Sequence, residues 1–174
     1  MNSDTGDYIN ANYVNMEIPN GTINRYIATQ GPLQNTVKDF WRMVQQESSH
    51  LIVMLTTVME RGRIKCFQYW PANAEMLDMG DGFTVKCFNE HADETGSFVF
   101  RDLVMCDSKT GEQRTIQHMQ YLAWPGKKEL HYTGSFFNNF SFCFRSRSSI
   151  RSEIIFGIYR KSSCCTKYDI TSRD

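Results

Sequence analysis

The six cysteines are the residues of this sequence with the widest chemical repertoire, because a thiolate can attack a substrate, bind a metal or form a disulfide. They are Cys66, Cys87, Cys106, Cys143, Cys164 and Cys165. None belongs to a C-x-x-C pair, and the four histidines (His50, His91, His118 and His131) are dispersed as well. This spacing favours free thiols in a reducing compartment over a disulfide framework or a zinc site. We therefore expect no metal and no cofactor.

The segments that would position these side chains have mainly the patterns of strands. A capped helix is expected from Asn35 or Thr36 to about Glu47. The apolar face of that helix is expected to comprise Val37, Phe40, Trp41 and Val44. Strands are predicted near residues 8–14, 25–30, 51–55, 65–70, 83–88, 97–105 and 115–124, with turns at 19–21 and 60–63. The fold class is therefore α/β of the mixed α+β kind, a twisted mixed sheet with a flanking helix.

Two of these strands have distinctive patterns. The run Leu51–Leu55 is continuously apolar, which predicts a strand buried on both faces. In the strand at 115–124, alternation places Ile116, His118, Gln120 and Leu122 on one side.

The composition changes after Pro125. Residues 1–125 carry 10 Lys+Arg and 15 Asp+Glu, whereas residues 126–174 carry 9 and 4. All nine Met, all three Trp and all four Pro lie at or before Pro125, and the remainder is rich in Ser and holds half of the 12 Phe. We therefore divide the chain into a domain at 1–125 and a basic, Ser- and Phe-rich tail at 126–174. The tail is expected to be a poorly ordered extension; the alternative is further strands at Phe140–Phe144 and Glu153–Tyr159.

The start of the chain is polar and has no apolar signal core. The longest aliphatic run, Leu51–Leu55, is too short to span a bilayer. We expect a cytoplasmic protein without a transmembrane segment.

Six blocks of residues follow one another along the chain: Asp7–Tyr13 (DYINANY), Tyr26–Leu33 (YIATQGPL), Asp39–Met43 (DFWRM), Ile52–Thr56 (IVMLT), Lys65–Pro71 (KCFQYWP) and Gln120–Pro125 (QYLAWP). In this order they resemble successive motifs of the protein-tyrosine phosphatase domain. The match covers about residues 7–125. The stretches Asn15–Pro19 and Glu60–Arg63 look most like the non-receptor members that carry FERM and PDZ modules. The resemblance implies an incomplete tyrosine-phosphatase-like domain followed by a divergent C-terminal tail.

The family's chemistry needs a low-pKa cysteine in a His-Cys-x5-Arg loop at a helix N-terminus, where backbone amides and the arginine hold the phosphate. The residues six positions after the cysteines of this chain are Ala72, Asp93, Glu112, Ser149, Ile170 and Thr171. None is an arginine, and no cysteine follows a histidine. Cys143 lies near three arginines, but its surroundings lack the glycines that such a loop requires.

The family's general acid is an aspartate that follows Trp-Pro, and the matching position here is Gly126, after Trp124 and Pro125. Lys127 and Lys128 are cationic and cannot replace a carboxylic acid, and we do not assign Glu129 to that role. The truncation before the cysteine loop therefore leaves no catalytic residue.

Some supporting positions of the family are present. Glu60 and Lys65 match residues that brace the phosphate-loop arginine and the closed acid loop, although without those partners they are more simply a solvated pair at a turn. Cys66 matches a cysteine behind the site, and packing is its default role. We expect four aromatic side chains in the core: Trp41, Tyr69, Trp70 and Tyr121.

Three functions are open on these observations. The first is a truncated phosphatase domain without activity, phosphotyrosine proteins being substrates of the intact family only. The second is a non-catalytic, pseudophosphatase-like module that binds proteins through exposed sheet edges. The third, a membrane or nucleic-acid patch on the tail, is not favoured by a net charge of +5 in 49 residues, so no nucleic-acid partner is expected. Loss of the family's central strand and its later helices should also leave strand edges unpaired and solubility poor.

Overall fold

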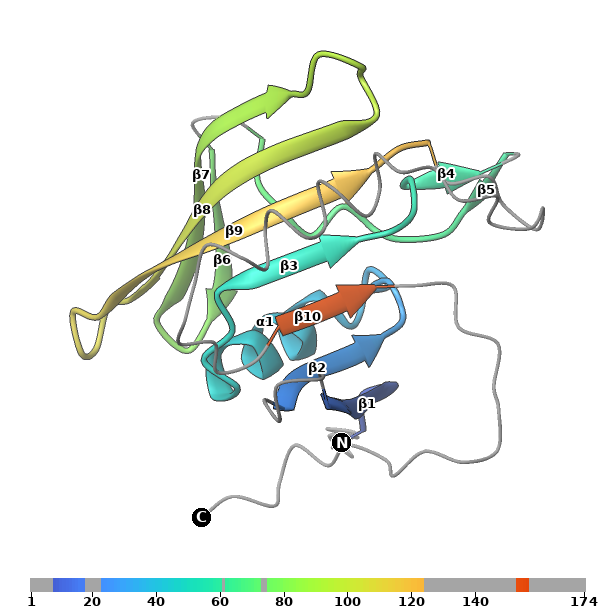
Figure 1. The fold of residues 1–174 in the computed structure, drawn as a ribbon. Coiled ribbons are helices and arrows are strands. Elements are labelled where there is room, and N and C mark those ends of the chain that lie inside the picture. The colour runs from blue at the N-terminus through green and yellow to red at the C-terminus, as the bar shows by residue number, and fades with distance from the viewer. Residues whose placement is uncertain (1–7, 18–22, 61, 73–74, 124–152, 157–174) are drawn as a thin grey trace.

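The computed structural model describes residues 8–17, 23–60, 62–72, 75–123 and 153–156 (Figure 1). These residues form one helix, α1 (Val37–Gln46), and ten strands. The strands are β1 (Ala11–Glu17), β2 (Ile23–Thr29), β3 (Leu51–Met54), β4 (Met59–Glu60), β5 (Arg63–Ile64), β6 (Met76–Gly80), β7 (Phe83–Ala92), β8 (Phe98–Asp107), β9 (Gln113–Tyr121) and β10 (Glu153–Phe156).

Eight of the described strands form one mixed sheet, in the order β1-β2-β10-β3-β9-β8-β7-β6. The four central strands β2, β10, β3 and β9 are parallel to one another. The outer pairs β1–β2, β6–β7, β7–β8 and β8–β9 are antiparallel. Strands β4 and β5 form a separate hairpin. This mixed sheet with a helix against it confirms the predicted fold class.

The central position of the sheet is filled by β10, which pairs with β2 on one side and β3 on the other (Figure 1). The expectation of unpaired edges at this point is therefore wrong. That expectation assumed that this chain has no strand at the centre of the sheet, whereas Ile154 and Ile155 are β-branched residues that favour a strand and lie in β10. For residues 153–156, the strand alternative is correct; the rest of the tail lies outside the described residues.

The core has two parts, one on each side of the sheet. On the side we call the helix face, Phe40, Trp41 and Val44 of α1 pack against Ile52 and Met54 of β3. On the opposite side, the second face, a smaller cluster contains Leu51, Val53, Phe98, Met119 and Tyr121. All four residues of β3 are buried, as the continuous apolar run predicts.

The helix begins close to where the sequence places it. Its N-cap residue is Thr36, and Val37, Phe40, Trp41 and Val44 are buried as expected. The Thr36 hydroxyl does not cap the helix; it accepts a hydrogen bond from Leu33 N at 2.9 Å instead. In the described part of the chain, no helix combines the length and apolar content needed to cross a bilayer.

One strand prediction is wrong. Residues 65–70 are irregular, with Tyr69 and Trp70 both buried although they are adjacent, which the alternating sides of a half-exposed strand would not allow. The Phe67 amide donates to Pro32 O at 2.7 Å, which ties this segment to the chain after β2. Strand β6 was not anticipated, β1 begins three residues later than predicted, and the turn at 19–21 lies outside the described residues.

Candidate functional site

Two of the four sequence-predicted support residues, Glu60 and Lys65, lie together at the β4–β5 hairpin. Lys65 Nζ is 3.8 Å from Glu60 Oε2, and both side chains are about one-third exposed. Gly62 makes the turn with a φ of 73°, a left-handed conformation that suits glycine. Because an exposed pair of this kind stabilises a fold by about 0–1 kcal/mol, the geometry agrees with a solvated pair at a turn.

Cys66, which follows this hairpin in the sequence, is fully buried. Burial raises the pKa of its thiol to about 12, so the nucleophilic thiolate is scarce at neutral pH. Gly31 lies against it so closely that a Cβ at position 31 would be 2.8 Å from Cys66 Cβ. The packing role expected of Cys66 is confirmed.

The four aromatic residues expected in the core are all buried. Trp41 Nε1 donates to Tyr69 O at 2.8 Å, which joins α1 to the irregular segment at 65–70. The Tyr69 ring makes edge contacts with Phe40 and Trp70 at centroid distances of 4.9 and 5.0 Å. These aromatics are therefore structural.

A buried polar cluster, formed by Tyr69, Arg101, His118 and Gln120, is the feature that sequence reasoning missed. Tyr69 Oη and His118 Nε2 are 2.6 Å apart, and Arg101 Nη1 lies 3.3 Å from His118 Nδ1. Arg101 Nη1 also donates to Gln120 Oε1 at 3.0 Å. The predicted alternation along β9 places His118 and Gln120 on one side, and two polar residues at core-facing positions are the signal that could have revealed the cluster.

The protonation of His118 follows from its neighbours. A guanidinium has only donors, so His118 Nδ1 must accept, and the proton of the neutral ring lies on Nε2, which donates to Tyr69 Oη. Burial, and then the positive charge of Arg101, hold the pKa of His118 well below its usual value. A protonated His118 would direct a second N–H at Arg101, so the cluster requires the neutral imidazole.

The positive charge of Arg101 is balanced by groups on the side of the guanidinium that faces away from His118. Its Nε forms an ion pair with Glu90, and its guanidinium carbon lies 4.6 Å from the centre of the Trp70 ring. Glu90 remains partly exposed, whereas Arg101 is buried. A buried cation with both a carboxylate and an aromatic partner is satisfied, so the cluster braces β8 against β9 and the 65–70 segment.

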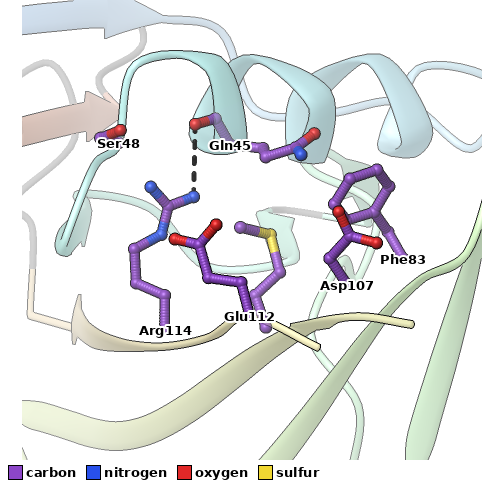
Figure 2. A pocket seen from close by; sticks show the side chains of 7 residues that line it. Gln45, Ser48, Phe83, Asp107, Glu112 and Arg114 are labelled. Carbon is purple, nitrogen blue, oxygen red and sulfur yellow. Dashed lines mark hydrogen bonds between the residues drawn. The ribbon is translucent and has the colours of Figure 1, made fainter. Parts of the chain in front are cut away.

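A small cavity of about 120 Å³ lies between the end of α1 and the sheet (Figure 2). It is lined by Gln45, Ser48, Phe83, Met105, Asp107, Glu112 and Arg114. Arg114 Nη2 donates to the helix-terminal carbonyls of Val44 and Gln45 at 3.4 and 3.3 Å, a favourable place for a cation. No sequence-predicted site residue lines this cavity. We interpret it as a gap in the packing around the C-terminus of α1 and not as a functional site.

The remaining sequence-predicted positions, Trp124, Pro125, Gly126, Glu129 and Cys143, lie outside the described residues. Cys66, Cys87 and Cys106 are free thiols. Among the described residues, no group of three or more His, Cys, Asp and Glu side chains is arranged to hold a metal ion.

Comparison with known proteins identifies what this architecture resembles. A family model described as protein-tyrosine phosphatase matches residues 1–157. Tyrosine-protein phosphatase 1 of Caenorhabditis elegans is 50% identical over 124 residues, which are 71% of this chain and 12% of that protein. Tyrosine-protein phosphatase non-receptor type 4 of Mus musculus is 48% identical over 120 residues, 68% of this chain and 13% of that protein. Non-receptor type 2 of Mus musculus is 39% identical over 150 residues, 86% of this chain and 35% of that protein.

Proposed function

Because this chain belongs to the protein-tyrosine phosphatase family, we propose that the 174-residue polypeptide is a domain of that family without phosphatase activity of its own. One observation carries the proposal. No cysteine in the sequence is followed six positions later by an arginine, and Gly126 stands where the family has its acid. The chain therefore lacks both the activated nucleophile and the proton donor.

The described cysteines support this proposal. Cys66 and Cys87 are buried, and burial is the main cause that raises the pKa of each thiol. A phosphatase cysteine needs the opposite, a pKa lowered by a helix N-terminus and nearby cations. Glycine at position 126 has no proton to give to a phenolate leaving group.

An activity assay with two substrates tests the nucleophile and the general acid separately. Nitrophenolate leaves with little protonation, so hydrolysis of para-nitrophenyl phosphate reports mainly on a nucleophile, whereas a phosphotyrosine peptide also needs the acid. We expect no turnover of either substrate above the enzyme-free blank, with a complete phosphatase domain of a relative as the positive control. Turnover that vanadate abolishes would overturn the proposal.

Phosphotyrosine hydrolysis is proposed only for an intact product. The chain spans about an eighth of the length of the first two relatives. Sequencing the transcript beyond the codon for Pro125 decides whether a longer product exists. A reading frame that continues with an aspartate and a later His-Cys-x5-Arg motif would make the parent enzyme a phosphotyrosine hydrolase.

A non-catalytic protein-binding role is the second candidate. The outer strands β1 and β6 of the described sheet each have a single strand neighbour and carry exposed apolar side chains, among them Val14 and Met76. Such edges can accept an added strand from a partner. Retention of no more protein by the folded chain than by a denatured control would count against this role.

We further propose a cytoplasmic location. The free thiols at Cys66, Cys87 and Cys106 suit a reducing compartment, and two of the relatives named above are of the non-receptor type. Imaging of the tagged chain in cells, with a secreted variant as a control, tests this location.

A further inference from the structure

The edge of the sheet at β7 is only partly covered by β6. Strand β7 runs from Phe83 to Ala92, but β6 pairs with it only between Phe83 and Lys86. Residues 87–92 have β8 on their other side. Among the described strands, none pairs with the open side of this stretch. The end of β7, residues 87–92, is therefore a free strand edge.

The hydrogen bonds beside this edge show which of its backbone groups face outward. Asp93 N donates to Phe98 O at 3.0 Å. Because bonding alternates along an antiparallel ladder, His91 is the next residue whose backbone bonds to β8. The N–H and C=O groups of Glu90 and Ala92 therefore point away from β8. Both residues are exposed, and unpaired backbone groups of this kind are a template on which another strand can pair.

A β-bulge places an apolar side chain on the same edge. The register shifts between Cys87 and Asn89, which leaves Phe88 without a register partner in β8. A bulge of this kind can re-aim a side chain, and Phe88 is 65% exposed. An exposed phenylalanine beside a free edge offers a contact for an apolar side chain of an added strand.

The charge around this edge favours one kind of strand. Residues 87–102 contain one basic side chain, Arg101, and four acidic ones, Glu90, Asp93, Glu94 and Asp102. Arg101 is buried, whereas all four acidic residues are exposed or partly exposed. A basic segment is therefore attracted to this edge, and a nucleic acid is repelled from it.

We propose that residues 87–92 of β7 are a docking edge for an extended, basic segment of another protein, which adds to the sheet as a short strand. The main chain of the partner pairs with Glu90 and Ala92, and one of its apolar side chains contacts Phe88. A second copy of the chain is disfavoured, because it brings two acidic edges together. This docking edge rests on the second candidate function, protein binding, and is independent of phosphatase activity.

Peptide binding to the full chain, measured by fluorescence anisotropy, tests the docking edge. The probe is a labelled peptide of alternating lysine and valine, and its counterpart has glutamate in place of lysine. We expect the lysine peptide to bind, the glutamate peptide not to bind, and added salt to weaken the binding. Equal binding of the two peptides would overturn the proposal, since it would show that charge does not select the strand.

Two proline variants, Ala92→Pro and Asn15→Pro, form a matched pair. Each replaces an exposed residue of β7 or β1 whose N–H points away from the neighbouring strand, so the proline removes no bond of the ladder. For β1, this direction follows from the bond of Gln30 N to Asn10 O at 3.2 Å.

We expect Ala92→Pro to weaken binding of the lysine peptide about tenfold, because it removes a donor and its ring obstructs the edge. Asn15→Pro should leave the affinity unchanged. The reverse result would place protein binding at β1, which would keep the second candidate function and refute the docking edge on β7. An equal loss in both variants would refute it as well.

Hydrogen exchange of the parent chain gives a test that does not depend on the folding of the variants. The outward amides of Glu90 and Ala92 should exchange quickly without peptide and slowly with the lysine peptide bound. Binding that leaves these two amides unprotected would refute strand addition. In sedimentation without peptide, a dimer that Ala92→Pro dissociates would assign the edge to self-association and overturn the proposal.

Discussion

Acidification is expected to destabilise this fold through His118. Burial and the charge of Arg101 hold the pKa of His118 well below its usual value, so the folded chain resists protonation of the imidazole more than the unfolded chain does. The unfolded chain binds a proton at this residue with a pKa of about 6.5. Because the unfolded state then binds more protons, the free energy of unfolding falls as the pH falls through that value.

The size of the effect follows from that one proton. From pH 7.5 to pH 5.5, a group with an unfolded pKa of about 6.5 lowers the free energy of unfolding by at most about 1.4 kcal/mol, the limit in which the folded chain binds no proton there. Urea unfolding at the two pH values measures this change in the free energy of unfolding. The fluorescence of the buried Trp41 and Trp70 reports the unfolding.

The matched control is His118→Gln, which removes the titrating group and keeps a hydrogen-bonding side chain. We expect this variant to be less stable at pH 7.5 by about 1–3 kcal/mol, because Tyr69 and Arg101 lose their imidazole partner. It should also lose most of the difference between the two pH values. An equal pH dependence in the parent chain and the variant would refute the assignment to His118.

Three further outcomes are expected. Gly31→Ala should lower the melting temperature, because the Cβ of the new alanine would be 2.8 Å from Cys66 Cβ. We expect a loss of about 1–3 kcal/mol in the free energy of unfolding. An unchanged melting temperature would mean that the segments around Gly31 and Cys66 separate easily. The thiol of Cys66, whose pKa is raised to about 12 by burial, should resist a thiol reagent at pH 8 in the folded chain and react in urea, as mapped by mass spectrometry. A double-mutant cycle of Glu60→Gln and Lys65→Met should give a coupling energy below about 1 kcal/mol; a larger value would show that the exposed pair at 3.8 Å is stronger than its geometry implies.

Local sequence patterns predicted the helix and the strand in which buried residues recur at regular spacing. The continuous apolar run at 51–54 is a strand buried on both faces, and the helix at Val37–Gln46 buries the expected side. Residues 65–70 were misread because adjacent aromatics pack there in a connection held by Pro32 O. Strand β6, which has no fully buried residue, gave too weak a signal.

The positions of these elements depend on contacts between distant parts of the chain. The sequence suggested a strand at 153–159 but not its place between β2 and β3, because pairing between residues more than 100 positions apart leaves no local pattern. For the same reason, the buried polar cluster joins Tyr69 to residues of β8 and β9 that sequence spacing does not relate. The division of the chain at Pro125 stays a prediction.

The central place of β10 has a consequence for the order of synthesis. Strands β2 and β3 leave the ribosome long before the four residues of β10 that join them. Until residue 156 has emerged, the nascent sheet has two inner edges with unpaired backbone groups, a state that invites association with other chains. Pairing between strands so far apart in the sequence also slows folding. We therefore expect the yield of folded protein to depend on chaperones that shield the growing chain until β10 is released.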